Sequence, residues 1–530
     1  MSKNSFIQLG GSKRQAPQNK RIKVTPQTKT MRLHLRINDS NSTLPRLAAA
    51  VKNGEMTPLS AEQLSVLLSH ACQSAVGKVS KAVSEAGFSV GNFDPHTGLL
   101  PVEGSARLVR QHFGATLNEY LDERGNAFTG RKGVLSLPSE WDISDEVAAV
   151  HGIDQRPKLQ PRYIDAGVIG VQPRQSMARS WNAKAAADHY GVPQNKLGGG
   201  WSVGFVSLGG GLDPKVCERA NARLGLSAPK ITIITVDGAS NSPSGSMDGA
   251  DGENYLDSQV QAAVAPLADQ IMAIGPNTVT GFANALLALA KHERKPRKIS
   301  ISWGAREDGE WTDSDRDLFD RALQVCMAMG INVFCAAGDD GSSDGAKDGK
   351  AHCDYPASSP WNCACSGVYD NGSVVKAWNA TFGGATGGGV SLKYPQYTAE
   401  QLLLQKAGVK LPVHADTGKP GRVVGDIAGI ADPATGIEVM APNGSIHVIG
   451  GTSAVSPFHA AAGVCLDSEL GKATPDFNAT LYKLAADGKN VCMPVTKGSN
   501  GAYNCNDGDV FNAVCGLGPI DYKKFFAALK

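Results

Sequence analysis

The stretch WSVGFVSLGGGLDPKVCERANARLGLSAPKITIITV (201–236) contains two apolar segments separated by a glycine turn and a polar segment. The segments 201–208 and 230–236 are short and apolar, which predicts β-strands, and 213–224 is predicted to form a helix between them. The glycines at 209–211 allow a sharp turn where the chain leaves the first strand. This order of elements is the β-α-β unit from which parallel sheets are built.

The same alternation continues along the chain. We predict helices over 253–265, 281–293 and 314–329, and strands over 270–274, 298–303 and 331–337. This spacing predicts an α/β fold with a doubly wound parallel sheet. In such sheets, functional groups collect at the carboxyl ends of the strands. Two of the predicted strand ends carry clustered acids, so catalytic acids are expected there.

The bulk composition excludes several classes of protein. The chain has 530 residues, 42% of them hydrophobic and 19% charged, which suffices for two domains with large cores. Its formal net charge of +2 gives no reason to expect nucleic acid as a partner. No apolar run reaches the ~18 residues of a membrane-spanning helix, so no membrane partner is expected. The basic N-terminus lacks the apolar core of a secretory signal, which predicts a cytoplasmic protein or export by another route.

Changes in composition divide the chain into four parts. Residues 1–30 are polar and basic and are predicted to form a disordered tail. Residues 31–162 contain helical and strand-like patterns and are predicted to form a compact α+β domain. Residues 163–180 have weak periodicity and are predicted to be an exposed linker. Residues 181–530 contain the alternating pattern of the predicted parallel sheet.

A serine follows a second glycine turn, in VIGGTSAVSPFHAAAG (448–463). Ser453 stands where this turn enters an apolar helical segment, which would expose its hydroxyl at a helix N-terminus, as a nucleophile requires. Its base is expected among the carboxylates. Glu253 and Asp257 are four residues apart, on one face of a predicted helix, so they can share a proton. Taken singly, these residues fit an N-cap serine and a solvated helix start better than catalytic groups.

Taken together, the motifs resemble those of the sedolisins, the serine-carboxyl peptidases, and most closely the kumamolisin-like members. Ser453 lies in a G-T-S-A-x-x-P motif, and Asp339 follows A-A-G. Glu253 and Asp257 follow a D-G turn, as in the family. Subtilases share the Gly-Thr-Ser signature, but they need a catalytic histidine and place asparagine where Asp339 stands. The sedolisin resemblance is therefore preferred.

The α+β domain resembles the activation propeptide of the same family. VEGSARLVRQHFGATLNEY (102–120) and VHGIDQRP (150–157) fit its second half. The resemblance implies a zymogen in which 31–162 is the propeptide and an intramolecular inhibitor, 163–180 carries the autocatalytic cleavage site, and 181–530 is a catalytic domain of subtilisin-like fold. It also implies an extracellular protein, although no signal peptide is visible, with a cytoplasmic location as the alternative.

The resemblance implies a role for each of four residues. Ser453 would attack the scissile carbonyl, with Glu253 as general base and then general acid. Asp257 would orient Glu253 and share its proton. Asp339 would donate a hydrogen bond to the oxyanion together with the Ser453 backbone N–H, which requires a protonated carboxyl. The implied activity is therefore highest in acid.

Substrate-binding positions are implied around the same strand ends. Ser302, Trp303, Gly304 and Gly388 would form edges to which an extended peptide adds main-chain hydrogen bonds. Asp354 matches an acid near the family's first specificity pocket. It implies a basic or polar residue before the cleaved bond; the alternative is a structural turn aspartate.

The calcium site of the family is expected to be altered in this chain, and no other cofactor is implied. The site takes two aspartates near the C-terminus, and the matching positions are Pro494 and Asn512, which supply no carboxylate. We expect weak calcium dependence unless nearby aspartates rebuild the site. A disulfide among Cys492, Cys505 and Cys515 is expected to hold this loop instead.

Two other functions fit parts of the sequence. A catalytically silent peptide-binding protein could use the same scaffold, but all four catalytic positions are filled. A nucleotide-binding protein could use the glycine turns, but no complete G-x-x-x-x-G-K-[ST] or G-x-G-x-x-G follows a strand. The sequence therefore predicts a self-processing serine-type endopeptidase that acts on peptides or proteins.

Overall fold

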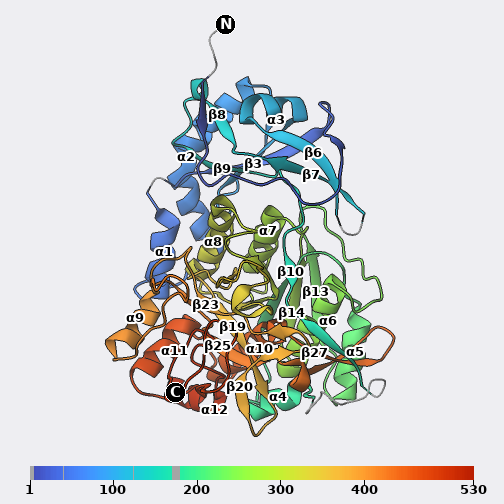
Figure 1. Ribbon diagram of the computed structural model, residues 1–530, viewed down its shortest axis with the longest axis vertical. Helices are drawn as coiled ribbons and strands as arrows, with labels where there is room; N and C mark the ends of the chain where they lie inside the picture. Colours follow the sequence, from blue (N-terminus) through green and yellow to red (C-terminus); the bar gives the residue numbers. More distant parts are fainter. Residues whose placement is uncertain (1–4, 40, 123–124, 170–179) are drawn as a thin grey trace.

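The structure, a computed structural model, describes residues 5–39, 41–122, 125–169 and 180–530. An N-terminal domain in blue and teal lies above a larger C-terminal domain in green to red (Figure 1). The segment between them enters the lower domain through β10 (Gln160–Pro161). No helix in these ranges is long and apolar enough to cross a membrane.

The lower domain is built on one eight-stranded sheet. Its strands are β12 (Ser202–Ser207), β13 (Lys230–Thr235), β14 (Asp269–Ile274), β15 (Lys298–Ile301), β17 (Asn332–Ala336), β19 (Cys363–Asp370), β20 (Val375–Ala377) and β25 (Ile427–Ile430). They follow the order β13-β14-β12-β15-β17-β19-β20, with β25 also beside β19, and every pair except β19 with β20 is parallel. The first of these strands, β12, lies inside the sheet and later strands are added on both of its sides. The predicted doubly wound parallel sheet is therefore confirmed.

Helices cover both faces of this sheet because the strands are apolar on both faces. On one face lie α4 (Ala183–His189), α5 (Pro214–Arg223), α6 (Ala250–Val264) and α10 (Val455–Leu470), and on the other α7 (Val279–Ala290) and α8 (Asp313–Ala328). Further helices are α9 (Ala399–Lys406), α11 (Phe477–Ala486) and α12 (Tyr522–Leu529). Every residue of α6 is buried, its acids included. Glu253 and Asp257 of this helix therefore lie in the protein interior, in contrast to an ordinary solvated helix start.

The lower domain also has short strands outside the main sheet. They are β16 (Trp303–Arg306), β18 (Asp354–Tyr355), β21 (Asn379–Thr381), β22 (Gly384–Ala385), β23 (Gly389–Val390), β24 (Val423–Val424), β26 (Ile437–Met440) and β27 (Ile446–Gly450). Strand β16 pairs with β18 on one side and with β10 of the connecting segment on the other. The connecting segment is thus held by strand pairing to the lower domain.

The upper domain combines antiparallel sheets with α-helices. Its strands are β1 (Phe6–Gln8), β2 (Arg21–Val24), β3 (Thr30–Ile37), β4 (Ser89–Val90), β5 (Leu99–Ser105), β6 (Thr116–Leu121), β7 (Ala127–Lys132), β8 (Ser136–Pro138) and β9 (Val147–His151). They form a four-stranded sheet β4-β5-β3-β9, a three-stranded sheet β2-β6-β7 and the pair β1-β8. The alternating strand β3 points one face at α2 (Ala61–Glu85) and α3 (Ala106–Phe113), as its period of two predicts.

The prediction of a disordered tail over residues 1–30 is wrong for the part that the structure describes, from residue 5 onward. Strand β1 pairs with β8, and β2 pairs with β6. All side chains of both strands are exposed, so no pattern of buried apolar residues marks these strands in the sequence. Backbone hydrogen bonds and charge pairs hold this segment, and Arg14 forms one of these pairs with Asp315 of the lower domain.

The two domains share an apolar core. Helix α1 (Thr43–Lys52) of the upper domain lies against α8 and beside α9 (Figure 1). Leu44 and Ala48 are fully buried in the same apolar cluster as Phe319 of α8. At the end of α1, the Lys52 ammonium lies 2.9 Å from the Glu400 carboxylate. The upper domain is therefore packed onto the lower domain through its core and not only through the connecting segment.

All eleven cysteines are free thiols. The predicted disulfide among Cys492, Cys505 and Cys515 is therefore wrong. The Cys505 sulfur lies 3.6 Å from the Asn512 side-chain oxygen instead. Hydrogen bonds within the loop, described below, replace the expected cross-link.

Candidate active site

Ser453 lies in the turn between β27 and α10. Gly451 enters this turn with φ of 103°, a conformation that favours glycine. A Cβ at this position would lie 2.4 Å from the Arg162 carbonyl oxygen and 2.6 Å from Asp339 Oδ2. Gly451 is therefore required both by the turn and by the close approach of two groups to it, and Ser453 follows in a fixed, fully buried position.

Glu253 provides the hydrogen-bond acceptor for this serine. The Ser453 hydroxyl donates to Glu253 Oε2 over 3.0 Å. Burial, together with the nearby Asp257 carboxylate, raises the pKa of Glu253 well above its usual range. A carboxylate with a raised pKa is a stronger base than a free one, which is what a serine hydroxyl needs.

Asp257 lies one helical turn after Glu253, and both carboxyl groups are fully buried. Asp257 Oδ1 accepts a hydrogen bond of 2.6 Å from the Ser302 hydroxyl. Burial raises the pKa of Asp257 well above its usual range. Glu253 Oε1 and Asp257 Oδ2 are buried and have no hydrogen-bond partner among the described residues. The pair is therefore suited to carry one proton between them.

Asp339 follows β17, at the carboxyl edge of the sheet. Its Oδ1 accepts hydrogen bonds of 2.8 Å from both the backbone N–H and the hydroxyl of Thr452. Its Oδ2 is buried and has no partner in the described part of the chain. Burial raises the pKa of Asp339 to about 7, although the Thr452 donors oppose the rise. Oδ2 can therefore carry a proton in acid and donate it to a neighbour.

The connecting segment crosses this group of side chains as an extended strand. Gln160 and Pro161 pair with Gly304 and Trp303 of β16. These pairs place the segment on the strand edge that the sequence predicts for substrate binding. Beyond the active site, β11 (Ile164–Val168) pairs with β27. The segment is therefore held by a strand on each side of Ser453.

The Arg162 backbone forms hydrogen bonds with Ser453 through both its N–H and its carbonyl oxygen. Its N–H donates to the Ser453 hydroxyl over 3.0 Å and to the Ser302 carbonyl over 3.1 Å. Its carbonyl oxygen accepts the Ser453 backbone N–H over 2.8 Å. As noted above, this carbonyl and Asp339 Oδ2 approach the same face of Gly451. The Arg162 carbonyl thus lies between two groups able to stabilise an oxyanion.

The Arg162 side chain fills an acidic pocket. Its guanidinium donates a hydrogen bond to Asp354, which is almost fully buried, and lies 3.5 Å from carboxylate oxygens of Asp344 and Asp340. Burial alone would lower the pKa of Arg162, but the surrounding acids outweigh burial and raise it. Asp354 faces a basic side chain, and its role in specificity stays a prediction.

Sequence reasoning did not single out Arg162 or Tyr163. The Tyr163 hydroxyl donates to the Met247 carbonyl over 2.7 Å, just before α6. The signal in the sequence that could have identified Arg162 is that this basic residue directly precedes the change in composition at residue 163. The atoms nearest to Gly388, in contrast, lie outside the connecting segment. A Cβ at this glycine would lie 2.7 Å from the Ala513 carbonyl oxygen. Residues 170–179 of the predicted linker lie outside the described residues.

The C-terminal loop does not fit the calcium site implied by the family. Pro494 has no side-chain oxygen. Asn512 Oδ1 accepts hydrogen bonds from the backbone N–H groups of Val514 and Cys515, over 3.1 and 2.9 Å, so it is committed to closing its own turn. No group of three or more potential ligands (His, Cys, Asp or Glu) that could hold a metal ion occurs within the described ranges. Weak calcium dependence stays a prediction.

The chain is similar to several known proteins. The family model of the pro-kumamolisin activation domain matches residues 17–156, and this match begins inside the predicted tail. Kumamolisin from Bacillus sp. (strain MN-32) is 36% identical over 419 residues, covering 77% of this chain and 73% of that protein. Tripeptidyl-peptidase sed5 from Aspergillus fumigatus is 24% identical over 448 residues, covering 76% and 73%. The structure of Pseudomonas sedolisin, a serine-carboxyl proteinase complexed with pseudo-iodotyrostatin, matches with a TM-score of 0.57 and 24% identity, covering 67% of this chain and 98% of that one.

Proposed function

Since the chain belongs to the sedolisin family of serine-carboxyl peptidases and carries the activation domain of a kumamolisin-type zymogen, we propose that it is an acid-acting endopeptidase that cleaves its own Arg162–Tyr163 bond. The observation that carries this proposal is the placement of the Arg162 carbonyl on the Ser453 N–H, with the Ser453 hydroxyl bonded to Glu253. The sequence predicted cleavage within 163–180; this geometry supports the bond at the start of that segment.

The proposed chemistry follows from the contacts. The Ser453 oxygen attacks the Arg162 carbonyl carbon while its proton passes to Glu253. The negative charge on the carbonyl oxygen is stabilised by the Ser453 N–H and by protonated Asp339. Glu253 then gives the proton to the Tyr163 nitrogen, the peptide bond breaks, and the acyl group stays on Ser453. In the second half of the reaction, a water molecule attacks the ester carbonyl carbon while Glu253 takes its proton. The bond to the Ser453 oxygen then breaks, Glu253 returns the proton to that oxygen, and Arg162 leaves with a free carboxyl group.

The positioning of the base depends on two neighbours that do not touch the reacting carbonyl. Asp257 shares a proton with Glu253 across the helical turn, and the Ser302 hydroxyl orients Asp257 through its 2.6 Å hydrogen bond. Because the proton is shared, Glu253 can accept the serine proton while the pair as a whole carries a single negative charge. A protonated pair loses this capacity, which sets the lower pH limit of the reaction.

Self-processing should be fast in acid and should be lost as the pH rises through about 7. Asp339 must be protonated to donate, and its pKa of about 7 means that a rising pH removes this proton. Incubation of the purified chain from about pH 3 to about pH 8, followed by intact-mass analysis, measures the profile. A rate that stays constant across this range would contradict the carboxyl mechanism. A chain that binds peptides but is never cut would support the catalytically silent alternative.

Arg162→Ala should slow the first cut by about 10²-fold, because it leaves the buried Asp354 without its partner. Arg162→Lys keeps the charge but loses the planar guanidinium, so an intermediate rate is expected. Gln160→Ala is the matched control, since this exposed side chain lies on the same strand and its backbone pairing is retained. N-terminal sequencing of the earliest product should give Tyr163. A first product that begins elsewhere would overturn the assignment of the bond.

A further inference from the structure

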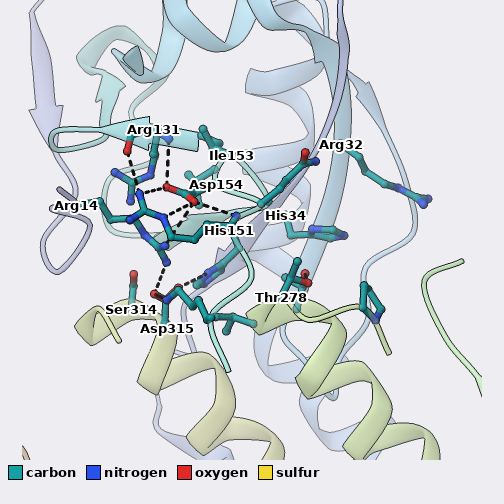
Figure 2. Close-up of a pocket in the computed structure, with 18 residues that line it drawn as sticks. Arg14, Arg32, His34, Arg131, His151, Ile153, Asp154, Thr278, Ser314 and Asp315 are labelled. Carbon is teal, nitrogen blue, oxygen red and sulfur yellow. Dashed lines mark hydrogen bonds and ion pairs between the residues drawn. The ribbon is translucent and has the colours of Figure 1, made fainter. Parts of the chain in front are cut away.

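A cavity of about 330 Å³ lies at the junction of the two domains, away from Ser453. Figure 2 shows it between strands of the upper domain and the first turns of α7 and α8, which begin near Thr278 and Ser314. The upper-domain residues that line it come from the N-terminal segment, from β3, β7 and β9, and from the loop after β9. The cavity exists only while the two domains are packed together.

The lining is rich in positive charge. Four arginines and one lysine line the cavity, against two carboxylates, those of Asp154 and Asp315. The cations are Arg14, Arg32, Arg131, Arg156 and Lys158. Two histidines, His34 and His151, lie among them on paired positions of β3 and β9. The positive charges therefore outnumber the negative ones even when both histidines are neutral.

The two carboxylates are already fully used. Asp315 accepts hydrogen bonds from Arg14 and, over 2.5 Å, from Lys158. Asp154 pairs with Arg156 over 2.7 Å and lies 3.8 Å from Arg14 (Figure 2). The Arg131 backbone N–H donates to Asp154 over 3.2 Å, but its guanidinium forms no ion pair within the described ranges and donates instead to the backbone carbonyls of Gly133 and Ser12. The structure thus leaves an excess of positive charge in a partly enclosed space.

The pKa values of several of the basic groups in the cavity are lowered. Burial lowers the pKa of Lys158 to about 8 and of Arg131 to about 10. Burial also lowers the pKa of His34 to about 4, and His151 adds to this effect. His151 Nε2 and His34 Nδ1 are buried and have no hydrogen-bond partner among the described residues. The unpartnered ring nitrogens can donate hydrogen bonds to an anion, and the nearby cations can neutralise its charge.

The start of α7 adds donors of the same kind. The first N–H groups of a helix have no acceptor within the helix, and the helix dipole makes this end positive. The Thr278 side chain caps only the N–H of Gly281. Val279 and Thr280 line the cavity at this end of α7. The catalytic domain therefore contributes anion-binding groups opposite those of the upper domain.

We propose that this cavity binds a tetrahedral oxyanion, inorganic phosphate or sulfate, that bridges the two domains of the zymogen. The anion would accept hydrogen bonds from His34, His151 and the start of α7, and it would neutralise the surrounding cations. Chloride lacks the several acceptor oxygens that such a set of donors requires. The anion would bind only the packed zymogen, so it would also slow the separation of the domains.

Calorimetric titration of the full-length Ser453→Ala chain tests this proposal without any need for peptidase activity. Phosphate and sulfate are titrated in separate arms at about pH 6.5, where the histidines titrate in free peptides, against sodium chloride of equal ionic strength. We expect one saturable site for at least one oxyanion, and a rise in melting temperature with its concentration. Absence of saturable binding in both arms, or an equal rise with chloride, would overturn the proposal.

Two variants and a control locate the site. His151→Gln removes one proposed hydrogen-bond donor and Arg32→Gln removes one surrounding positive charge, so each should weaken oxyanion binding by about tenfold. Arg32 is exposed, so its replacement leaves the fold intact even if His151→Gln does not fold. Arg107→Gln, an exposed position on α3, should bind as the parent does. Equal weakening by Arg107→Gln, or unchanged binding in Arg32→Gln, would place the anion elsewhere and refute the proposed site.

Discussion

The Ser453→Ala chain should remain a single 530-residue polypeptide in acid, where the unaltered chain is cut. The substitution removes the oxygen that lies 3.0 Å from Glu253 and that contacts the Arg162 N–H. Loss of a serine nucleophile typically lowers the rate on the order of 10⁶-fold, because the remaining oxyanion donors supply only a small part of the catalysis. Intact-mass analysis over time measures the effect.

Ser468→Ala provides the matched control for this variant. Ser468 lies on the same helix, α10, and its hydroxyl donates to the Gly199 carbonyl, away from the carboxyl groups. Both variants should melt near the temperature of the parent zymogen, whereas only Ser453→Ala should lose processing. If Ser453→Ala matured in cis at the parent rate, Ser453 would not be the nucleophile.

Asp339→Ala should lower peptidase activity by about 10²-fold or more, the typical cost of one lost oxyanion donor. Asp339→Asn should keep much of the activity. Its Oδ1 can still accept from Thr452, and its Nδ2 takes the position of the unpartnered Oδ2, next to the Arg162 carbonyl. The amide donates at every pH, so the loss of activity near pH 7 that is expected with Asp339 should shift to higher pH or disappear.

The pH–rate profiles of the two Asp339 variants and the parent separate this role from a structural one. Asp487→Asn, at an exposed position after α11, is the control and should leave the profile unchanged. A merely structural aspartate would change the rate equally at all pH values. An Asp339→Asn profile with the same upper limit as the parent would therefore refute the role of the Asp339 proton.

The sheet of the catalytic domain could be predicted because its strands are apolar and alternate with helices at regular intervals. β12 and β13 were predicted within two residues of their bounds. The N-terminal strands could not be predicted, because β1 and β2 bury no side chain and depend on backbone pairing to distant partners. The expected disulfide failed for a similar reason, since closeness of cysteines in the sequence does not fix their geometry in space.

The candidate site was predictable to the extent that its groups lie in local motifs. Ser453, Glu253, Asp257 and Asp339 each stand at a strand end or in the first turns of a helix, and the structure brings them together. Arg162 was not predictable, because nothing in its local sequence tells which peptide bond reaches the serine. Its position follows from the pairing of β10 with β16, a contact between segments more than 140 residues apart.

The core shared through α1 changes how the cut affects the enzyme. Before the cut, the two domains belong to one chain, and their effective concentration is on the order of millimolar or higher. After the cut, Leu44 and Ala48 still lie in the apolar cluster of α8, so the upper domain stays bound as a separate polypeptide. Its release then becomes a bimolecular equilibrium that shifts with dilution. A concentrated preparation would remain inhibited although fully cleaved, and the same material would become active when diluted.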